Sequence, residues 1–317
     1  MQNGVVGFVG LGRMGTVMAA NLAAAGRRVV AYVRHPERLA ELKTLGVTST
    51  GSIADLFDCE FLVSMLPNDD AVREVFFGAN PGAADGLAAG MSPGAIHVSM
   101  STISTSAALQ FAAAHARRGQ GYVAAPVFGN PHAARNRELY IIAAGGAADI
   151  ERCRPLFDAL GQQTFLVGEE PSAANLIKLA GNVMTATALE VLGEVIALVR
   201  KCGLNPETFI NILTSTMFGG RVHRIYGGTI ASQAFAASGF VLPLALKDVT
   251  LALAEAQRAV VPMPSVSVAH DRLLTGIARG YAELDWTALG LIAAEDAGLQ
   301  SNIAAVGDAA ALSKASS

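Results

Sequence analysis

A glycine-rich loop between an apolar strand and an alanine-rich helix constrains the fold more than any other feature of this 317-residue chain. The apolar run at 5–9 leads into the loop Gly10-Leu11-Gly12-Arg13-Met14-Gly15. In a G-x-G-x-x-G loop the first glycine permits a tight turn, the second lets the backbone approach a pyrophosphate, and the third lets helix and strand pack closely. A second apolar run at 28–33 completes a β-α-β unit. The sequence therefore predicts a Rossmann-type dinucleotide-binding domain whose phosphates face residues 10–15.

The residues at the end of the second predicted strand indicate which dinucleotide binds. NAD-binding domains commonly carry an acidic residue there, whose carboxylate accepts a hydrogen bond from the ribose 2′-hydroxyl. This chain has Val33-Arg34-His35 instead. Arg34, together with Arg38, can bind a 2′-phosphate through charge-assisted hydrogen bonds and stack on the adenine; alternatively, both arginines are solvated at a helix start. The sequence favours NADP (NADPH) over NAD.

Alternating strands and helices continue to residue 168, which predicts a first domain over 1–168. Helices are expected at 37–44, 52–57 and 149–160, and strands at 61–66, 95–99, 122–127, 139–144 and 164–167. Two short segments, Met65-Leu66-Pro67 and Ser101-Thr102, follow the carboxyl ends of predicted strands. Open α/β sheets bind ligands at those ends, so we expect both segments to form part of the cofactor wall.

A long apolar segment at about 172–201 predicts a single helix that joins this domain to a second one. Lys178 and Asn182 lie four residues apart and therefore on one face of it. Either the lysine extends from a buried helix and the amide bonds a neighbour, or the two are a proton donor and its orienting amide. Hydride addition to a carbonyl leaves negative charge on oxygen, which an ammonium group stabilises and protonates. The reverse reaction needs the neutral amine, a form that burial and a nearby cation such as Lys247 favour.

The rest of the chain has helical periodicity at 206–216, 244–259, 265–280 and 286–296, with no convincing strand. It predicts an all-α second domain over 169–300, followed by a flexible Ser/Ala-rich tail over 301–317. The overall fold class is thus α/β, a Rossmann-type domain followed by an all-α domain. Because the helices of the second domain are apolar around much of their circumference, we expect a homodimer built mainly through it.

Composition narrows the functional classes. A net charge of −3 gives no electrostatic reason to expect nucleic acid or an anionic membrane as a partner, so a small-molecule substrate is favoured. Three widely spaced cysteines and six scattered histidines predict neither a disulfide framework nor a metal site. The first strand leaves no room for a signal peptide, and no apolar run is as long as a membrane span. These features predict a soluble cytoplasmic protein.

Several other residues invite a functional interpretation. A basic cluster follows Gly219-Gly220 and either holds an acidic group of the substrate or forms a solvated loop; it comprises Arg221, His223, Arg224 and Tyr226. His223 is a weaker candidate than Lys178 for the catalytic acid. Asp248 is expected to position Lys247, and the single tryptophan, Trp286, is expected to pack between helices.

Taken together, six motifs in this order resemble those of the β-hydroxyacid dehydrogenase family, which includes 3-hydroxyisobutyrate, tartronate semialdehyde and 6-phosphogluconate dehydrogenases. The resemblance covers residues 4–298 and rests on GFVGLGRMG at 7–15, MLP at 65–67, STIS at 101–104, APVFGN at 125–130, KLAGN at 178–182 and LKD at 246–248. It implies that Lys178 is the catalytic acid/base and that Asn182 orients the substrate. It also implies cofactor contacts for Leu66, Pro67, Thr102 and Lys247.

The family's substrate loop usually reads D-A-P-V-S-G-G, and this chain differs at Ala124, Phe128 and Asn130. The resemblance implies that Phe128, Gly129 and Asn130 contact the substrate, while the changed loop leaves the substrate's identity open. The leading hypothesis is an NADPH-dependent reductase or dehydrogenase that interconverts a small carbonyl or semialdehyde acid and its β-hydroxy acid. The alternatives are an imine reductase, whose relatives usually replace the lysine, and a non-catalytic NADP-binding protein, against which Lys178, Asn182 and Lys247 together argue.

Overall fold

The chain forms two compact units that share one long helix. The computed structural model describes residues 4–34, 39–78, 86–236 and 240–300. Internal contacts divide the chain into a first unit, Met1–Ala180, and a second unit, Gly181–Ser317. The division falls inside helix α8 (Pro171–Lys201) rather than before it. The reason is that the first turns of α8 belong to the core of the first unit, where Ala174 is fully buried. The predicted 301–317 tail lies outside the described residues.

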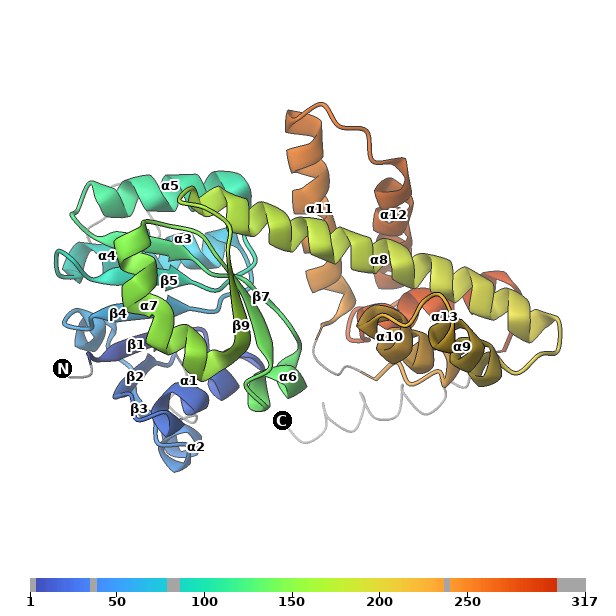
Figure 1. Ribbon diagram of the computed structural model, residues 1–317, viewed down its shortest axis with the longest axis horizontal. Coiled ribbons are helices and arrows are strands. Elements are labelled where there is room, and N and C mark those ends of the chain that lie inside the picture. Colours follow the sequence, from blue (N-terminus) through green and yellow to red (C-terminus); the bar gives the residue numbers. More distant parts are fainter. Residues whose placement is uncertain (1–3, 35–38, 79–85, 237–239, 301–317) are drawn as a thin grey trace. The chain divides into compact units, whose positions relative to one another are not determined.

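A six-stranded parallel sheet forms the centre of the first unit (Figure 1). Its strands lie in the order β3-β2-β1-β4-β5-β6, with bounds Thr48–Thr50, Val29–Tyr32, Val6–Val9, Phe61–Ser64, Ile96–Ser99 and Gly121–Ala124. Val9 is in register with Tyr32 on one side and with Ser64 on the other. The order reverses direction at β1, and in such sheets the ligand crevice lies at the carboxyl ends of the strands flanking that reversal. This confirms the predicted Rossmann-type domain.

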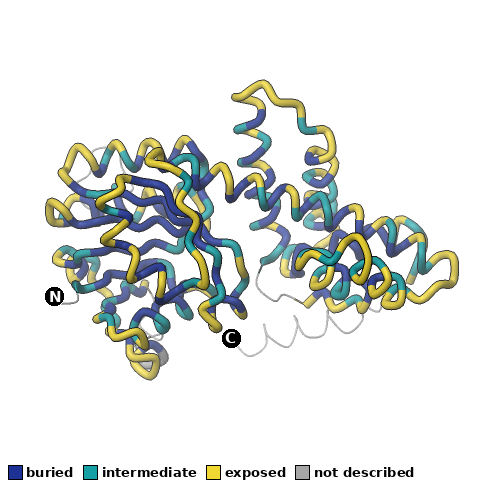
Figure 2. The backbone as a smooth tube through the Cα atoms, viewed as in Figure 1, coloured by how far each residue is buried: buried dark blue, intermediate teal, exposed yellow. Residues whose placement is uncertain are grey.

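Successive residues of each strand point to opposite faces of the sheet and enter two separate cores, because side chains alternate along a strand. Phe8 packs on the face that holds α1 (Gly15–Ala24), α2 (Leu39–Thr44), α6 (Pro131–Arg135) and α7 (Ala147–Leu160). Val9 packs on the face that holds η2 (Ile53–Leu56), α3 (Asp69–Phe77), α4 (Leu87–Gly90) and α5 (Thr105–Ala116). Burial of the strands on both faces is visible in Figure 2.

A small second sheet completes the first unit. It contains β7 (Val127–Phe128), β8 (Leu139–Ala143) and β9 (Gly161–Leu166), with β7 antiparallel and β9 parallel to β8. The single strand predicted at 122–127 is in fact β6 and β7, which belong to different sheets. Pro126 lies between them and has no N–H to donate to a ladder, so the strand breaks there. Strand β3 was not predicted because its sequence, TST, carries no apolar alternation.

Helix α8 differs from expectation at its start and in its hydropathy. It begins at Pro171, one residue before the predicted start, and proline suits the first helical position because its missing N–H would have no partner there. Gly203, with φ +75°, follows its end and adopts the left-handed conformation that commonly ends a helix. By length and composition α8 could cross a membrane, contrary to the expectation for every apolar run of the chain, but half of its most apolar window is buried inside the protein. One such helix is weak evidence for a membrane span, because a core helix of a soluble protein passes the same test of length and composition.

The second unit is helical, with no strand among its described residues. Its further helices are α9 (Pro206–Ser215), α10 (Arg221–Ala231), α11 (Leu242–Arg258), α12 (Pro264–Ala278), η3 (Trp286–Ala288) and α13 (Leu289–Asp296). Helix α10 occupies the segment for which a solvated loop was considered. Its paired glycines, two before it and two within it, obscure the helical period, since glycine is a poor helix former.

Helix α13 is the core of the second unit, because residues 289–294 are all buried. It crosses α8 at a pair of glycines. A Cβ added to Gly193 would lie 2.8 Å from the Cα of Gly290, so the two backbones approach more closely than any side chain would permit. Trp286 is 5% exposed and its ring is close to perpendicular to those of Tyr226 and Phe240, which confirms its packing role.

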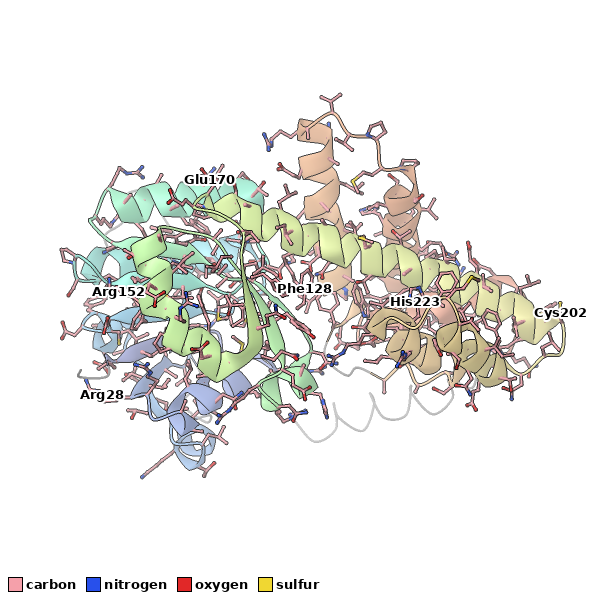
Figure 3. The ribbon with its side chains drawn as sticks, in the orientation of Figure 1. Arg28, Phe128, Arg152, Glu170, Cys202 and His223 are labelled. Atoms are coloured by element: carbon pink, nitrogen blue, oxygen red, sulfur yellow. The ribbon has the colours of Figure 1, made fainter. Side chains whose placement is uncertain are left out.

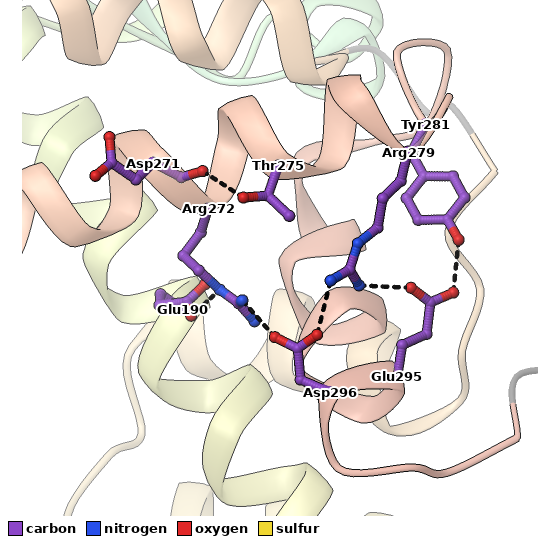
Figure 4. Close-up of polar contacts among 8 residues, drawn as sticks. All are labelled: Glu190, Asp271, Arg272, Thr275, Arg279, Tyr281, Glu295 and Asp296. Carbon is purple, nitrogen blue, oxygen red and sulfur yellow. Dashed lines mark hydrogen bonds and ion pairs between the residues drawn. The ribbon is translucent and has the colours of Figure 1, made fainter.

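A polar network ties α8, α12 and α13 together (Figure 4). Glu190 of α8 is 4% exposed and accepts a hydrogen bond from Nε of Arg272 at 2.8 Å. Burial raises the pKa of Glu190, and the Arg272 charge opposes that rise. The network continues through ion pairs and hydrogen bonds to Asp296, Arg279, Glu295 and Tyr281. Arg272 therefore compensates a carboxylate that α8 would otherwise bury alone.

Candidate active site

Two glycines of the loop after β1 are required by the protein's own packing. Gly10 has φ +92°, and a Cβ added there would lie 2.2 Å from the carbonyl oxygen of Met65. A Cβ on Gly15 would lie 1.9 Å from the carbonyl oxygen of Gly10. Gly10 thus makes the turn beside the end of β4, and Gly15 lets α1 begin against that turn, as the motif predicts.

Gly12 is different, because no contact within the described protein requires it to be glycine. It is exposed, and a Cβ added there would meet no other described atom within 4 Å. The open space lies at the loop that leads into α1, where a pyrophosphate would approach the backbone in a dinucleotide complex. The loop therefore fits a dinucleotide. Its other members are Leu11, which is buried, Arg13, which is exposed, and Met14, which is half-buried.

The other predicted cofactor residues of the first unit follow the carboxyl ends of neighbouring strands. Arg34 is exposed just after β2, whereas Arg38 lies outside the described residues. The N–H of Leu66 donates to Oγ of Ser101 at 2.8 Å, which joins the segments after β4 and β5. Pro67 is exposed and Thr102 is half-buried at this edge. The structure thus brings together the two segments expected to form the cofactor wall, while the individual contacts stay predictions.

Lys178 lies on α8 within the first unit. Its residue is only 8% exposed, and its Nζ lies 4.5 Å from the centre of the Phe128 ring, within the range of a cation–π interaction. One turn earlier on α8, Asn175 donates to the carbonyl oxygen of Ile103 at 3.4 Å. This contact fixes the lysine's helix against the segment that follows β5.

Asn182, one turn beyond Lys178 on α8, is held by a residue of α11. Its Nδ2 donates to Oδ2 of Asp248 at 2.5 Å, and Nζ of Lys247 lies 2.8 Å from Oδ1 of the same carboxylate. Asp248 is 1% exposed. A carboxylate only accepts hydrogen bonds, so Asp248 fixes which side of the Asn182 amide carries the nitrogen. From the sequence, Asp248 was expected to position Lys247 only. Its bond to Asn182 was not predicted, because a single sequence does not show that residues 66 positions apart are in contact.

The predicted substrate loop has a defined backbone. Phe128 ends β7 opposite Tyr140 of β8. Gly129 has φ +142°, and a Cβ there would lie 2.6 Å from Cδ2 of Leu139. Oδ1 of Asn130 accepts a hydrogen bond from the N–H of Ala133 at 2.9 Å and so caps α6. This Asn130 atom is engaged in the fold, and substrate contacts of the loop stay predictions.

A buried polar chain leads through the first unit to the end of β4. Oγ of Ser64 lies 2.8 Å from Nε2 of His97, and Nδ1 of His97 lies 2.9 Å from Nε2 of His115. Nδ1 of His115 lies 2.8 Å from Oε1 of Gln120. Burial lowers the pKa of both histidines, that of His115 to about 4, so both are neutral near pH 7.

The far end of this chain sets the direction of every hydrogen bond in it. Nε2 of Gln120 donates to the carbonyl oxygens of Ala88 and Met91, so its Oε1 must accept from Nδ1 of His115. A neutral imidazole has one donor and one acceptor, so Nε2 of His115 accepts from Nδ1 of His97. By the same reasoning, Nε2 of His97 accepts from the serine hydroxyl. A proton added to Nε2 of His115 would place two N–H donors face to face between the rings.

The basic cluster of the second unit does not gather as a single site. His223 packs on Phe218, with ring centres 5.2 Å apart, whereas Arg221 and Arg224 are exposed. His223, labelled in Figure 3, and Phe218 border an apolar groove of about 520 Å³. The groove's other lining residues are Val183, Met184, Thr187, Ala188, Val191, Leu192, Val195, Phe209, Leu213, Met263, Ser265 and Val266. Among the described residues there is no cluster of His, Cys, Asp and Glu that could hold a metal ion.

Comparison with known proteins shows the family to which this chain belongs. A family model of the NAD-binding domain of 6-phosphogluconate dehydrogenase matches residues 5–168, and one named for NADP-dependent 3-hydroxyisobutyrate dehydrogenase matches 172–292. The chain belongs to the β-hydroxyacid dehydrogenase family. This confirms the resemblance, and it makes the chain a nicotinamide-dinucleotide-dependent oxidoreductase from a family that acts on the CH–OH group of β-hydroxyacids.

Individual relatives match about 90% of this chain. An uncharacterized oxidoreductase of Bacillus subtilis, YfjR, is 39% identical over 90% of this chain and 98% of its own. The 2-hydroxy-3-oxopropionate reductase of Escherichia coli is 31% identical over 90% of this chain and 95% of its own. A solved structure of Psf3 in complex with NADP⁺ and 2-OPP has a TM-score of 0.81 at 26% identity and covers 91% of this chain and 99% of that one.

Proposed function

We propose that this protein is an NADPH-dependent reductase that interconverts a small carbonyl compound or semialdehyde acid and its β-hydroxy acid, with Lys178 as the acid/base. The observation that carries the proposal is the placement of Lys178, a buried lysine of α8 whose ammonium lies beside the predicted substrate loop. Burying a charged lysine costs free energy, so a purely structural position would favour an apolar residue there.

The chain's own groups can perform the proton transfer that carbonyl reduction requires. The bound cofactor would supply a hydride to the carbonyl carbon. Negative charge then develops on the carbonyl oxygen, where the ammonium of Lys178 stabilises it and donates a proton, which the resulting amine regains from solvent. Asp248 fixes the orientation of the Asn182 amide. That amide would bind oxygen atoms of the substrate at every pH, because an amide does not titrate.

Preference for NADPH rests on Arg34. It is exposed two residues after the end of β2, which pairs with the strand that leads into the glycine loop. A guanidinium binds a phosphate through charge-assisted hydrogen bonds, whereas the carboxylate common in NAD-binding domains would repel a 2′-phosphate. Leu66, Pro67, Thr102 and Lys247 are proposed as further contacts to the cofactor.

The test is turnover of Lys178→Met and Lys178→Ala on a panel of semialdehydes, keto acids and cyclic imines, followed by NADPH absorbance. Both substitutions should lower kcat by about 10²- to 10⁴-fold, the usual loss for a positioned acid. NADPH affinity should stay within a few-fold of wild type, because Lys178 is not part of the glycine loop. Lys178→Met keeps most of the side-chain length, so it should preserve Tm better than Lys178→Ala.

Lys43→Met is the matched control, since it removes an exposed lysine from α2 of the same unit; it should leave kcat unchanged. Near wild-type turnover by Lys178→Met on any substrate of the panel would show that Lys178 is not the acid. Turnover of cyclic imines but of no carbonyl compound would point instead to an imine reductase. NADPH binding without turnover of any compound would favour a non-catalytic protein.

A further inference from the structure

The aromatic ring of Phe128 covers one side of the proposed acid. Its centre lies 4.5 Å from Nζ of Lys178, close enough for the electron-rich ring face to attract the ammonium. Both residues belong to the first unit, Phe128 at the end of β7 and Lys178 on α8. Figure 3 labels Phe128 among the side chains at this end of β7. A carbonyl oxygen that accepts a proton from Lys178 must therefore approach beside this ring.

The backbone that carries the Phe128 ring is held on both sides. On one side Phe128 pairs with Tyr140 across the antiparallel β7–β8 ladder. On the other side Gly129 adopts φ +142° in a space that would not admit a Cβ, because Leu139 lies in the way. The next residue, Asn130, is held as the cap of α6. The Phe128 ring thus forms an apolar wall beside Lys178 and is carried by a well-defined backbone.

The chemistry of that wall differs from that of a polar one. A phenyl ring has no hydrogen-bond donor, and its face repels an anion for the same reason that it attracts the ammonium. A carboxylate placed against it would lose hydration without gaining a partner, which is unfavourable. An alkyl or aryl group placed there would instead exchange water for apolar contact.

We propose that Phe128 determines the substrate class, selecting carbonyl compounds whose group next to the reacting carbonyl is alkyl or aryl and discriminating against a carboxylate at that place. The proposal rests on the proposed function, because it requires that Lys178 protonate the carbonyl oxygen. It narrows that function: any acid group of the substrate must lie away from Phe128.

The test uses an isosteric pair of aldehydes, isobutyraldehyde and glyoxylate, in which an isopropyl group replaces a carboxylate beside the carbonyl. The measured quantity is the ratio of kcat/KM for isobutyraldehyde to kcat/KM for glyoxylate, with whichever nicotinamide cofactor the wild type uses faster. Hydration of each aldehyde is the same for every variant and cancels when variants are compared. Phe128→Ser should lower the ratio by about tenfold or more, the scale on which apolar pockets discriminate. Phe128→Leu, which stays apolar, should largely keep it.

The matched control is Phe165→Ser, which removes an aromatic ring of β9 that is 41% exposed and contacts Tyr140 of the same sheet; it should leave the ratio unchanged. The cofactor Kd and the Tm of each variant show whether it folds. If Phe128→Ser does not fold, Phe128→Gln takes its place as the polar variant. An unchanged ratio in a folded polar variant, with Lys178→Met inactive, overturns this inference alone. A wild type that reduces neither aldehyde nor any carbonyl compound of the wider panel overturns the proposed function as well.

Discussion

Asp248 accepts a hydrogen bond from Asn182 at 2.5 Å and pairs with Lys247 at 2.8 Å through its other oxygen. One buried carboxylate therefore orients two residues that the family resemblance assigns to different tasks, the substrate and the cofactor. Because its charge is what holds both, a neutral side chain of the same shape should not replace it.

Asp248→Asn should lower kcat/KM for the best substrate by about tenfold to a hundredfold, since hydrogen bonds to charged groups contribute about 1.5–3 kcal/mol. The loss should be divided between a higher KM for substrate and a weaker affinity for NADPH. Steady-state kinetics with cofactor titrations measure both. Asp271→Asn, at an 80% exposed acid of α12, is the control. Equal kcat/KM in wild type and Asp248→Asn would mean that the carboxylate is structural only.

Gly12→Val should fold normally and lose NADPH affinity by about tenfold or more, since the side chain would occupy the space of the pyrophosphate. Gly15→Ala should instead lower Tm, because its Cβ would lie 1.9 Å from the carbonyl oxygen of Gly10. Differential scanning fluorimetry with and without NADPH separates the two effects. Gly228→Ala, where an added Cβ also meets no described atom within 4 Å, should change neither. Tight NADPH binding by Gly12→Val would show that the pyrophosphate does not bind at this loop.

Arg34→Asp should raise the Kd of NADPH by about tenfold or more and lower that of NADH, because it exchanges a phosphate-binding cation for a group that accepts from a 2′-hydroxyl. Arg28→Asp makes the same change at the other end of β2, just before Val29, and should leave both constants unchanged. Equal affinity of the wild type for NADH and NADPH would contradict the assignment of Arg34.

The buried histidines predict acid sensitivity of the first unit. Their folded-state pKa values are lowered, so below about pH 6.5 the unfolded chain binds protons that the folded chain does not. Unfolding free energy should therefore fall as pH drops from about 6.5 towards 4, by on the order of 3 kcal/mol for His115 alone. Urea unfolding at a series of pH values measures the slope.

A double variant, His97→Asn with His115→Gln, should show a smaller loss of unfolding free energy between about pH 7 and pH 5, since neither new side chain titrates there. His132→Gln, at an exposed histidine of α6, is the control and should keep the wild-type slope. If the double variant loses as much free energy as the wild type over this interval, other groups cause the acid sensitivity.

The second unit is expected to mediate homodimer formation. Met184, Val191 and Leu198 are exposed on α8 by 76%, 52% and 62%, at a spacing of seven residues that places them on one face of the helix. The first two line the apolar groove. Met184→Glu combined with Val191→Glu should convert a dimer into a folded monomer, as measured by light scattering. Leu109→Glu, on α5 of the first unit, should not. A monomeric wild type at micromolar concentration would rule out the dimer.

The sequence predicted the features of the fold that depend on local pattern. The glycine loop, the parallel strands and α8 each have a signal within a short window, and the structure contains all three. Helix α10 was missed because glycines interrupt its period, and β3 because its residues are polar. The break between β6 and β7 had a signal, Pro126, that propensity alone did not separate from a continuing strand.

Features of the site that arise from distant residues were beyond a single sequence. The bond from Asn182 to Asp248, the ring of Phe128 over Lys178 and the chain from Ser64 to Gln120 join residues on different elements. Each residue was visible in the sequence, but its partner was determined by packing. Residue types therefore indicated candidate roles, and the fold determined which residues act on one another.

The crossing of α8 and α13 at Gly193 and Gly290 limits how this protein can be altered. A methyl group added at Gly193 would push α13 away from α8, whereas one added at Gly290 would collide with Ile230 of α10. Separation of α8 from α13 would also disturb Glu190, one turn earlier on α8, because its partner Arg272 also binds Asp296 on α13. Steric tolerance at the crossing and charge compensation of a buried carboxylate are thus coupled. A redesign of the second unit would have to change the glycine crossing and the Glu190–Arg272 pair together, or leave the two features as they are.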